Sequence, residues 1–448
     1  MREFLSMLLL CALCAPAICC AAGGGELRRP KTRLIVLTDI STLTADWGEA
    51  DDTESLIRLL LYSNELDIEG LLATQTGRDL IVNPQYIEHV VRKYGEVRED
   101  LLKHAEGYPG ERQLLDVVKA GLRGSEEVGA DKNSDASDWI ISVVDKPDPR
   151  PVWFTIWGGP RELAQALYKV SQSRTAAEAA RFRSKIRVYA IGDQDPTGKW
   201  IKATHPDVFY ITPYRAYRGM YRDGDTSLVT RRWVDTNLVT GHGPLGAAYP
   251  NYDGGDPWGA VKGVKEGDTP SLLYLIPNGL GDPEQPTWGS WGGRFGGEGP
   301  HYTDAKDTVD GTTSERATVY RWRRAYQNSF QARMDWCVTP FDKANHEPVA
   351  AVDGSRDRRV RPGQRVALSA AKSTDPDANK LSYDWLFYSE PSSYKGTLNI
   401  KTNGPEAGFT APEVDSPQTI HIVLTVTDDG SPPLSSYRRI VVTVDPKA

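Results

Sequence analysis

The sequence predicts a two-domain protein: an α/β domain on a mostly parallel sheet with flanking helices, followed by an all-β sandwich. Apolar runs alternate with helical periodicity over the first three quarters of the chain. Alternating apolar and polar residues, broken by turn signals, fill the last quarter. With 448 residues the chain has room for two or three cores, because a single core rarely grows past about 250–300 residues.

The α/β domain is predicted from strand and helix candidates that alternate along the chain. Strand candidates are 34–37, 68–73, 152–156, 186–191 and 208–211. Helix candidates are 53–63, 84–94, 113–121, 138–144 and 160–171. This alternation predicts a sheet whose ligand crevice lies beyond the carboxyl ends of its strands.

Residues 347–448 are predicted to form the sandwich, with 30–340 as the α/β domain and "TPFDKANHEP" as the linker. Turn signals such as Pro362-Gly363 and Asp429-Gly430 separate its short strands. The stretches "STDPDANKLSYDW" and "VTDDGSPP" resemble immunoglobulin-like modules of the PKD type. That resemblance implies an accessory domain of a kind that recurs on secreted glycan-active proteins.

The N-terminal segment reads as a secretory signal peptide over residues 1–22, with a charged start, an apolar stretch and small residues at its end. We therefore expect a secreted or periplasmic protein. Four of the five cysteines lie in this segment, so the mature chain would keep only Cys337 and form no internal disulfide. No later apolar run has the 18 or more residues that a spanning helix needs, so no membrane span is expected.

The net charge and the aromatic content limit the classes of partner that the protein is expected to bind. The net charge of −7 argues against a nucleic-acid polymer, which calls for a basic face. Twelve Trp and twenty Tyr suit stacking on sugar rings, although core packing is the competing explanation. We expect a carbohydrate or glycoside substrate, and a homodimer stays open.

Four carboxylates gather within fourteen residues near the first strand. Asp39 follows the apolar run 34–37, and Glu49, Asp51 and Asp52 lead into the first helix. An aspartate before a helix commonly acts as a cap, which would account for one of them. Carboxylates that share a crevice repel each other unless a cation neutralises them, and Ca²⁺ prefers such oxygen ligands. The cluster therefore favours a calcium site.

A strand ending in Asp39, with Asp51 and Asp52 opening a helix, resembles the aspartate cluster of nucleoside hydrolases. "ELDIEGLLATQTG", "FTIWGGPRELAQAL", "KIRVYAIGDQD" and "EGDTPSLLYLIPNG" are similar to later parts of that fold. The run "GDTPSLLYLIPNGLGDPEQPTWGSWGGRF" resembles more closely the nucleoside-hydrolase-like proteins of polysaccharide-degrading bacteria, some of them described as cellulose-binding. These proteins pair the domain with a C-terminal sandwich.

The resemblance implies a Ca²⁺ ion held by Asp39, Asp52, Asp268 and the carbonyl of Trp157, with Asp51 also near the metal. Asp39 would accept the proton of the attacking water as general base. Glu49 would bind substrate hydroxyls or complete the metal shell, and a solvated loop charge is the alternative.

Two departures from the nucleoside-hydrolase pattern concern the substrate. Gly267 replaces a histidine that helps to protonate the leaving base in one class of those enzymes, and Arg78 follows Gly77 where an asparagine is expected. The residues of the metal site therefore match the nucleoside-hydrolase pattern better than those of the substrate site do. Ordinary nucleosides are not the expected substrate.

Several residues are candidates for acid catalysis or substrate binding. His242, in a Gly- and Pro-containing loop, is the first candidate for the leaving-group acid, and a structural histidine is the alternative. Asp193 and Asp195 follow a strand and are expected to contact substrate, with turn and capping roles as alternatives. Glu266 is a further candidate acid.

A glycine-rich loop carries Trp288, Trp291 and Arg294. We expect these residues to bind substrate, with one of the two tryptophans stacking on a sugar. In the alternative, the tryptophans pin the loop to the domain surface.

The leading hypothesis is an exported Ca²⁺-dependent hydrolase of glycosyl bonds. The second is a carbohydrate-binding protein without catalysis, which would keep its ligand after loss of Asp39 while Ca²⁺ stays bound. A third is an adhesive surface protein in which the sandwich carries the binding activity.

Overall fold

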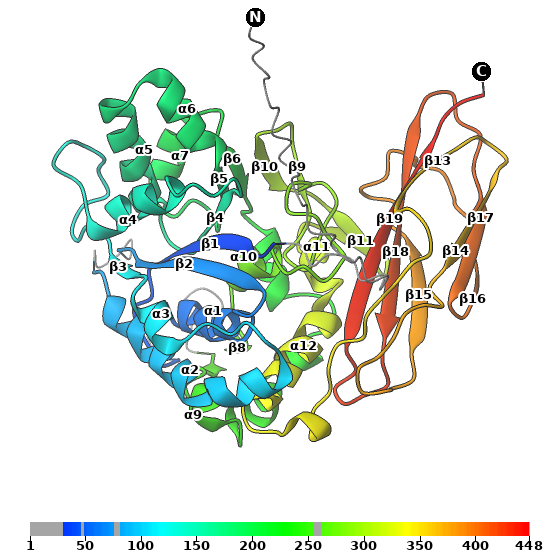
Figure 1. Ribbon diagram of the computed structural model, residues 1–448, viewed down its shortest axis with the longest axis horizontal. Coiled ribbons are helices and arrows are strands. Elements are labelled where there is room, and N and C mark those ends of the chain that lie inside the picture. The colour runs from blue at the N-terminus through cyan, green and yellow to red at the C-terminus, as the bar shows by residue number, and fades with distance from the viewer. Residues whose placement is uncertain (1–29, 46–48, 76–80, 255–260, 448) are drawn as a thin grey trace, which may run out of the picture. The chain divides into compact units, whose positions relative to one another are not determined.

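The computed structural model describes residues 30–45, 49–75, 81–254 and 261–447 (Figure 1). An eight-stranded sheet forms the first domain in the order β3-β2-β1-β4-β5-β6-β10-β9, parallel except for the β10–β9 pair. Its strands are β1 (Thr32–Thr38), β2 (Leu66–Ala73), β3 (Val118–Ala120), β4 (Val152–Ile156), β5 (Ile186–Ala190), β6 (Phe209–Thr212), β9 (Phe295–Gly296) and β10 (His301–Asp304).

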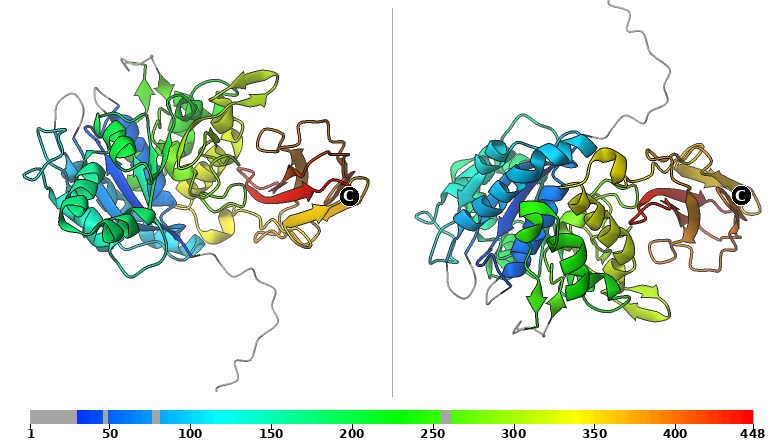
Figure 2. Two further views of the ribbon diagram at one scale, coloured as in Figure 1. Left: turned by 90° about the horizontal axis from the view of Figure 1, so that it is seen from above. Right: turned by 90° about the horizontal axis from the view of Figure 1, so that it is seen from below.

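Helices cover both faces of this sheet because both faces of its central strands are apolar. Leu34 and Val36 of β1 face one layer, whereas Ile35 and Leu37 face the other. The first layer contains α1 (Ala50–Leu61), α2 (Pro84–His104), α10 (Thr269–Leu273) and α12 (Arg323–Asp335). The second contains α4 (Asp135–Val144), α5 (Arg161–Ser173), α6 (Ala176–Ser184) and α7 (Thr197–Thr204), as Figures 1 and 2 show.

Short elements complete the domain. They are α3 (Glu111–Leu115), α8 (Arg231–Val234), α9 (Gly243–Ala247), α11 (Ala317–Tyr320), the single turns η1 (Ala216–Met220), η2 (Ser227–Val229), η3 (Asp235–Val239) and η4 (Phe341–Lys343), and the hairpins β7 (Tyr252–Asp253) with β8 (Lys262–Gly263) and β11 (Asp307–Val309) with β12 (Thr312–Ser314).

The predicted α/β class is confirmed, with one local error. The segment 113–121 was expected to be one helix, but α3 ends at Leu115 and β3 begins at Val118. Val118–Ala120 pairs with the end of β2 and extends the sheet, so tertiary pairing overrides the local helical pattern.

The C-terminal part is an all-β sandwich, as predicted. One sheet has the order β13-β19-β18-β15 and the other β14-β17-β16. Their strands are β13 (Asp357–Val360), β14 (Arg365–Ser369), β15 (Ser382–Phe387), β16 (Lys401–Asn403), β17 (Glu406–Thr410), β18 (Gln418–Thr427) and β19 (Ser435–Val444). Inward-facing side chains such as Val366, Phe409 and Ile422 form a separate core between the sheets.

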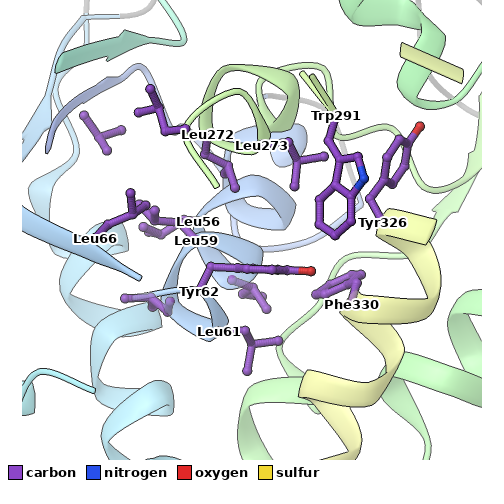
Figure 3. Close-up of a cluster of buried hydrophobic side chains, with 14 of the residues drawn as sticks. Leu56, Leu59, Leu61, Tyr62, Leu66, Leu272, Leu273, Trp291, Tyr326 and Phe330 are labelled. Carbon is purple, nitrogen blue, oxygen red and sulfur yellow. The ribbon is translucent and has the colours of Figure 1, made fainter. Parts of the chain in front are cut away.

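The two domains also share a core. Tyr388, Val423 and Tyr437 of the sandwich belong to the same buried cluster as Trp291 and Tyr326 of the first domain. Figure 3 shows Trp291 and Tyr326 in this cluster beside Phe330 of α12. Cys337 is buried as a free thiol. Within the ranges described, no helix is both long enough and apolar enough to cross a bilayer.

Candidate metal centre and active site

The carboxyl ends of β1 and β4 form the floor of the candidate site. Asp39 follows directly after β1 and is 4% exposed. Trp157 follows β4, and its backbone N–H donates to the carbonyl of Leu37, 2.8 Å away. Gly158 comes next, where an added Cβ would lie only 2.6 Å from the Asp39 carboxylate. Glycine is therefore needed here for the two strand ends to meet.

The start of α1 supplies three more acids. Ligand oxygens of Glu49, Asp51 and Asp52 all lie within 4.8 Å of one another. The capping explanation does not account for them: Glu49 holds the N-cap position without a side-chain capping bond, and the aspartates lie in the first turn. The positive end of the helix dipole favours their charge. The Thr38 hydroxyl donates to Asp52 Oδ1 and links this turn to β1.

Asp268 joins the cluster from a distant part of the chain. It is the N-cap residue of α10 and is 3% exposed. Burial, and next the Asp268 carboxylate, raise the pKa of Asp52 well above its usual range. Burial, and next Asp51 and Asp39, do the same to the pKa of Asp268. Asp39, Asp51 and Asp268 therefore all lie near enough to Asp52 to disfavour its charged form.

The carboxylates of the cluster repel one another when they are ionised. Burial and the facing Asp51 raise the pKa of Asp39 to about 7. Burial, then Asp51 and Asp39, raise the pKa of Glu49 to about 8. The ammonium of Lys265, 3.7 Å from Asp51 Oδ1, offsets part of the negative charge. Such a group of oxygens gains stability from a bound cation.

Trp157 lies beside the cluster but makes two other contacts. Its indole N–H donates to Ser271 Oγ at 3.0 Å, which ties β4 to α10. Its carbonyl accepts a hydrogen bond from the Gln194 amide. A carbonyl oxygen has a second lone pair, so a metal contact remains chemically open and stays a prediction.

The two aspartates after β5 differ in their surroundings. Asp195 accepts from the backbone N–H of Thr197 at 2.6 Å, and burial raises its pKa to about 6. It also contributes to the raised pKa of Asp39, so it borders the cluster while shaping the turn into α7. Asp193 pairs with Lys202 at 2.5 Å and accepts from the Tyr210 hydroxyl at 2.7 Å. Asp193 therefore forms an ion pair within the domain, and its expected contact with substrate stays a prediction.

Both candidate acids from the sequence have structural partners. His242 Nε2 lies 2.8 Å from Asp335 Oδ1 at the end of α12, and the neighbouring Gly243 faces Val97 and Val338. Among the described residues, no contact joins His242 to the acidic cluster. Glu266 is fully buried and accepts two hydrogen bonds from one arginine side chain. The leaving-group acid therefore stays unassigned.

The glycine-rich loop packs against the sandwich. Trp291 is 2% exposed, and its indole N–H donates to the Tyr437 hydroxyl at 3.1 Å. Trp288 is half-buried and packs edge-on against His421, with ring centroids 5.2 Å apart. Arg294 pairs with the buried Asp307 at 2.7 Å. Trp291 thus pins the loop, as in the alternative, whereas the substrate contacts expected of Trp288 and Arg294 stay predictions.

Sequence reasoning missed the tyrosine that borders the cluster. Tyr217 lies on η1, just beyond the carboxyl end of β6, and is half-buried. An added Cβ at Gly267 would lie 3.1 Å from Asp51 Oδ2 and 3.7 Å from the Tyr217 ring. The position of Tyr217 five residues after a parallel strand was a signal that could have been used. Arg78, named in the sequence comparison, lies outside the described residues.

A mostly parallel α/β sheet with acidic side chains beyond its carboxyl edge agrees with the resemblance to nucleoside hydrolases. The family described as "Cellulose-binding Sde182, nucleoside hydrolase-like domain" matches residues 33–295. "Cellulose-binding protein Sde0182, C-terminal domain" matches residues 365–444. The chain belongs to this Sde182 nucleoside-hydrolase-like family.

One solved structure agrees with this assignment. A nucleoside hydrolase-related hypothetical protein from Saccharophagus degradans, associated with carbohydrate metabolism, is 35% identical. The match covers 93% of this chain and 100% of that one, with a TM-score of 0.78. The PKD domain of the KIAA 1837 protein is 22% identical over 22% of this chain and 89% of its own, with a TM-score of 0.17. A search of the curated proteins gives no match.

Proposed function

We propose that this protein is an exported calcium-dependent hydrolase that cleaves a glycosyl bond of a carbohydrate or glycoside. The observation that carries the proposal is the acidic triad of Glu49, Asp51 and Asp52 at the start of α1. Asp39 and Asp268 support it, because each lies close enough to raise the pKa of Asp52. Membership of a nucleoside-hydrolase-like family and a relative associated with carbohydrate metabolism support it. Export rests on the signal peptide predicted for residues 1–22, which lie outside the described residues.

The donor set fits Ca²⁺. Two oxygens bound to one Ca²⁺ ion at 2.3–2.6 Å lie at most about 5 Å apart. The oxygens of Glu49, Asp51 and Asp52 meet this limit, lying within 4.8 Å of one another. Asp39, Asp268 and the Trp157 carbonyl would complete the shell. When bound there, the cation would lower the pKa of a water molecule and bind sugar hydroxyls.

The protein's own residues would then orient the water and accept its proton. Asp39 is the proposed general base, because its buried carboxylate lies beside the other acids and a bound cation would keep it ionised. Asp51 and Glu49 would bind hydroxyls or complete the metal shell. The reaction would pass through an oxocarbenium-like transition state, as glycosyl hydrolysis generally does.

Tyr217 is a further proposed sugar contact, in addition to the contact expected of Trp288. Its half-buried ring lies beside Gly267, and the carboxylates of Asp268 and Asp51 contribute to its raised pKa, of which burial is the main cause. Aromatic rings at such sites offer a flat apolar face to a sugar. The glycine leaves open the space that a side chain at 267 would occupy.

A carbohydrate-binding protein without catalysis is the second candidate. The observation that favours it is the cellulose-binding description of both matching families. A protein that only binds carbohydrate has no need for a water-activating carboxylate. The effect of substituting Asp39 on hydrolysis and on sugar binding therefore distinguishes the two functions.

The test is a screen of the purified protein against cellulose, plant and algal oligosaccharides, with chelator and with added Ca²⁺. We expect a chelator to stop hydrolysis and added Ca²⁺ to restore it. Asp39→Asn should lower the rate of hydrolysis at least about 100-fold. Asp193→Asn is the matched control, because its carboxylate pairs with Lys202 at the same sheet edge. Hydrolysis insensitive to chelation would contradict the metal mechanism. Sugar affinity without hydrolysis would favour the binder.

A further inference from the structure

One face of α1 is polar although most of it is buried. Asp51, Glu54, Ser55 and Arg58 follow the spacing i, i+3, i+4, i+7, which places them on one side of the helix. Glu54, Ser55 and Arg58 are each 0% exposed. The opposite side carries apolar residues such as Leu56 and Leu59, which Figure 3 shows in the core. Buried polar stripes are costly unless they have specific partners.

The partners of Glu54 are backbone groups more than 200 residues later in the chain. Glu54 Oε2 accepts from the backbone N–H groups of Lys265 and Glu266, at 2.8 and 2.7 Å. Thr269 Oγ1 donates to Ser55 Oγ at 3.0 Å. One carboxylate oxygen that binds two successive N–H groups fixes both the position and the direction of that segment.

Arg58 fixes the same segment through a side chain. Its Nε and Nη2 donate to the two carboxylate oxygens of Glu266, at 2.6 and 3.0 Å. Nη2 also donates to Gln327 Oε1 at 2.6 Å, which anchors the pair to α12. Such a two-pronged arginine–carboxylate pair allows little rotation or sliding.

These contacts join the two segments that carry the acids. The helix α1 begins with Asp51 and Asp52, whereas Asp268 comes two residues after Glu266. We propose that Glu54 and Arg58 are positioning residues that hold Asp268 opposite Asp51 and Asp52, ready for a cation. This inference rests on the proposed metal site and assigns it a clamp between segments more than 200 residues apart.

The test measures Ca²⁺ affinity of the full chain by calorimetric titration. We expect Glu54→Ala to weaken binding at least about tenfold, as loss of a ligand-orienting group commonly does. Glu54→Gln should bind within about threefold of the wild type, because its amide oxygen accepts the same two N–H groups. The control is Glu69→Gln, which alters the ion pair between Glu69 of β2 and the buried Arg33 of β1, 2.7 Å apart. The Ca²⁺ affinity of this control should not change.

Wild-type affinity in a folded Glu54→Ala variant would overturn the inference, because the clamp would then be structural only. If that variant does not fold, Arg58→Lys is the second variant, since it keeps the charge and loses the second hydrogen bond. It should weaken Ca²⁺ binding, and an unchanged affinity would again overturn the clamp. Absence of Ca²⁺ binding by the wild type would refute the metal site. The clamp is then read from amide exchange at Lys265 and Glu266, which Glu54→Gln should preserve and Glu54→Ala or Arg58→Lys should accelerate.

Discussion

At the scale of single residues, the acidic cluster combines carboxyl groups whose pKa values are raised. Asp39 and Glu49 have pKa values raised to about 7 and about 8, mainly by burial. A cation would replace these protons, because metal ligands must be ionised to bind. Protonation and metal binding therefore compete for the same oxygens.

This competition predicts how Ca²⁺ affinity depends on pH. The affinity should rise at least about tenfold between about pH 6 and about pH 8, because the carboxyls lose their protons over that range. Without metal the effect on folding has the opposite sign. The folded chain keeps protons that the unfolded chain releases above about pH 4, so its unfolding free energy should fall as the pH rises toward about 8. Calorimetric titration and denaturant unfolding at several pH values test both, and a pH-independent affinity would contradict the prediction.

At the scale of elements, the strands were predictable because they are nearly continuous apolar runs. The expected strand 152–156 coincides with β4, and 186–191 differs from β5 by one residue. Asp39 and Asp52 were indicated by the gathering of acids near the first strand, whereas Asp268 could be found only through resemblance to a family. The contacts of Glu54 could not be foreseen, because its partners are more than 200 residues away and are backbone groups without a sequence signal.

The turn between β4 and α5 is the element on which the cluster depends most closely. Gly158→Ala would place a methyl group 2.6 Å from the Asp39 carboxylate, so we expect Ca²⁺ binding to be lost or strongly weakened. Gly110→Ala is the matched control, because nothing lies within 4 Å of its added Cβ. Calorimetry reads the affinity, and circular dichroism confirms that both variants are folded. Equal Ca²⁺ affinities would show that Asp39 is not constrained by this turn.

At the scale of the whole molecule, the sandwich is joined to the α/β domain by a shared core. The buried Asp307 binds Arg294 and Arg321 of the first domain and the Tyr388 hydroxyl of the sandwich, at 2.5–2.7 Å. The burial of Trp291 could not be predicted from the sequence for this reason. Whether Trp291 is exposed depends on Tyr437, which lies 146 residues later in the chain.

Trp291→Ala should therefore lower the unfolding free energy by about 3–5 kcal/mol, as expected for a large aromatic side chain removed from a core. Tyr214→Ala is the control, since that tyrosine is 48% exposed and its removal should change stability by less than about 0.5 kcal/mol. Denaturant unfolding of the full chain measures both. A loss of sugar affinity at unchanged stability would instead restore Trp291 as a substrate contact.

The most direct measurement is a calorimetric titration of the full chain with Ca²⁺, comparing the wild type with Asp52→Asn. Asp52 contributes oxygens to the cluster and is held in place by Thr38. The wild type should bind one ion per chain, and the variant, which keeps the shape but loses the charge, should bind at least about tenfold more weakly. No binding by the wild type, or equal binding by both proteins, would contradict a calcium centre at this edge of the sheet.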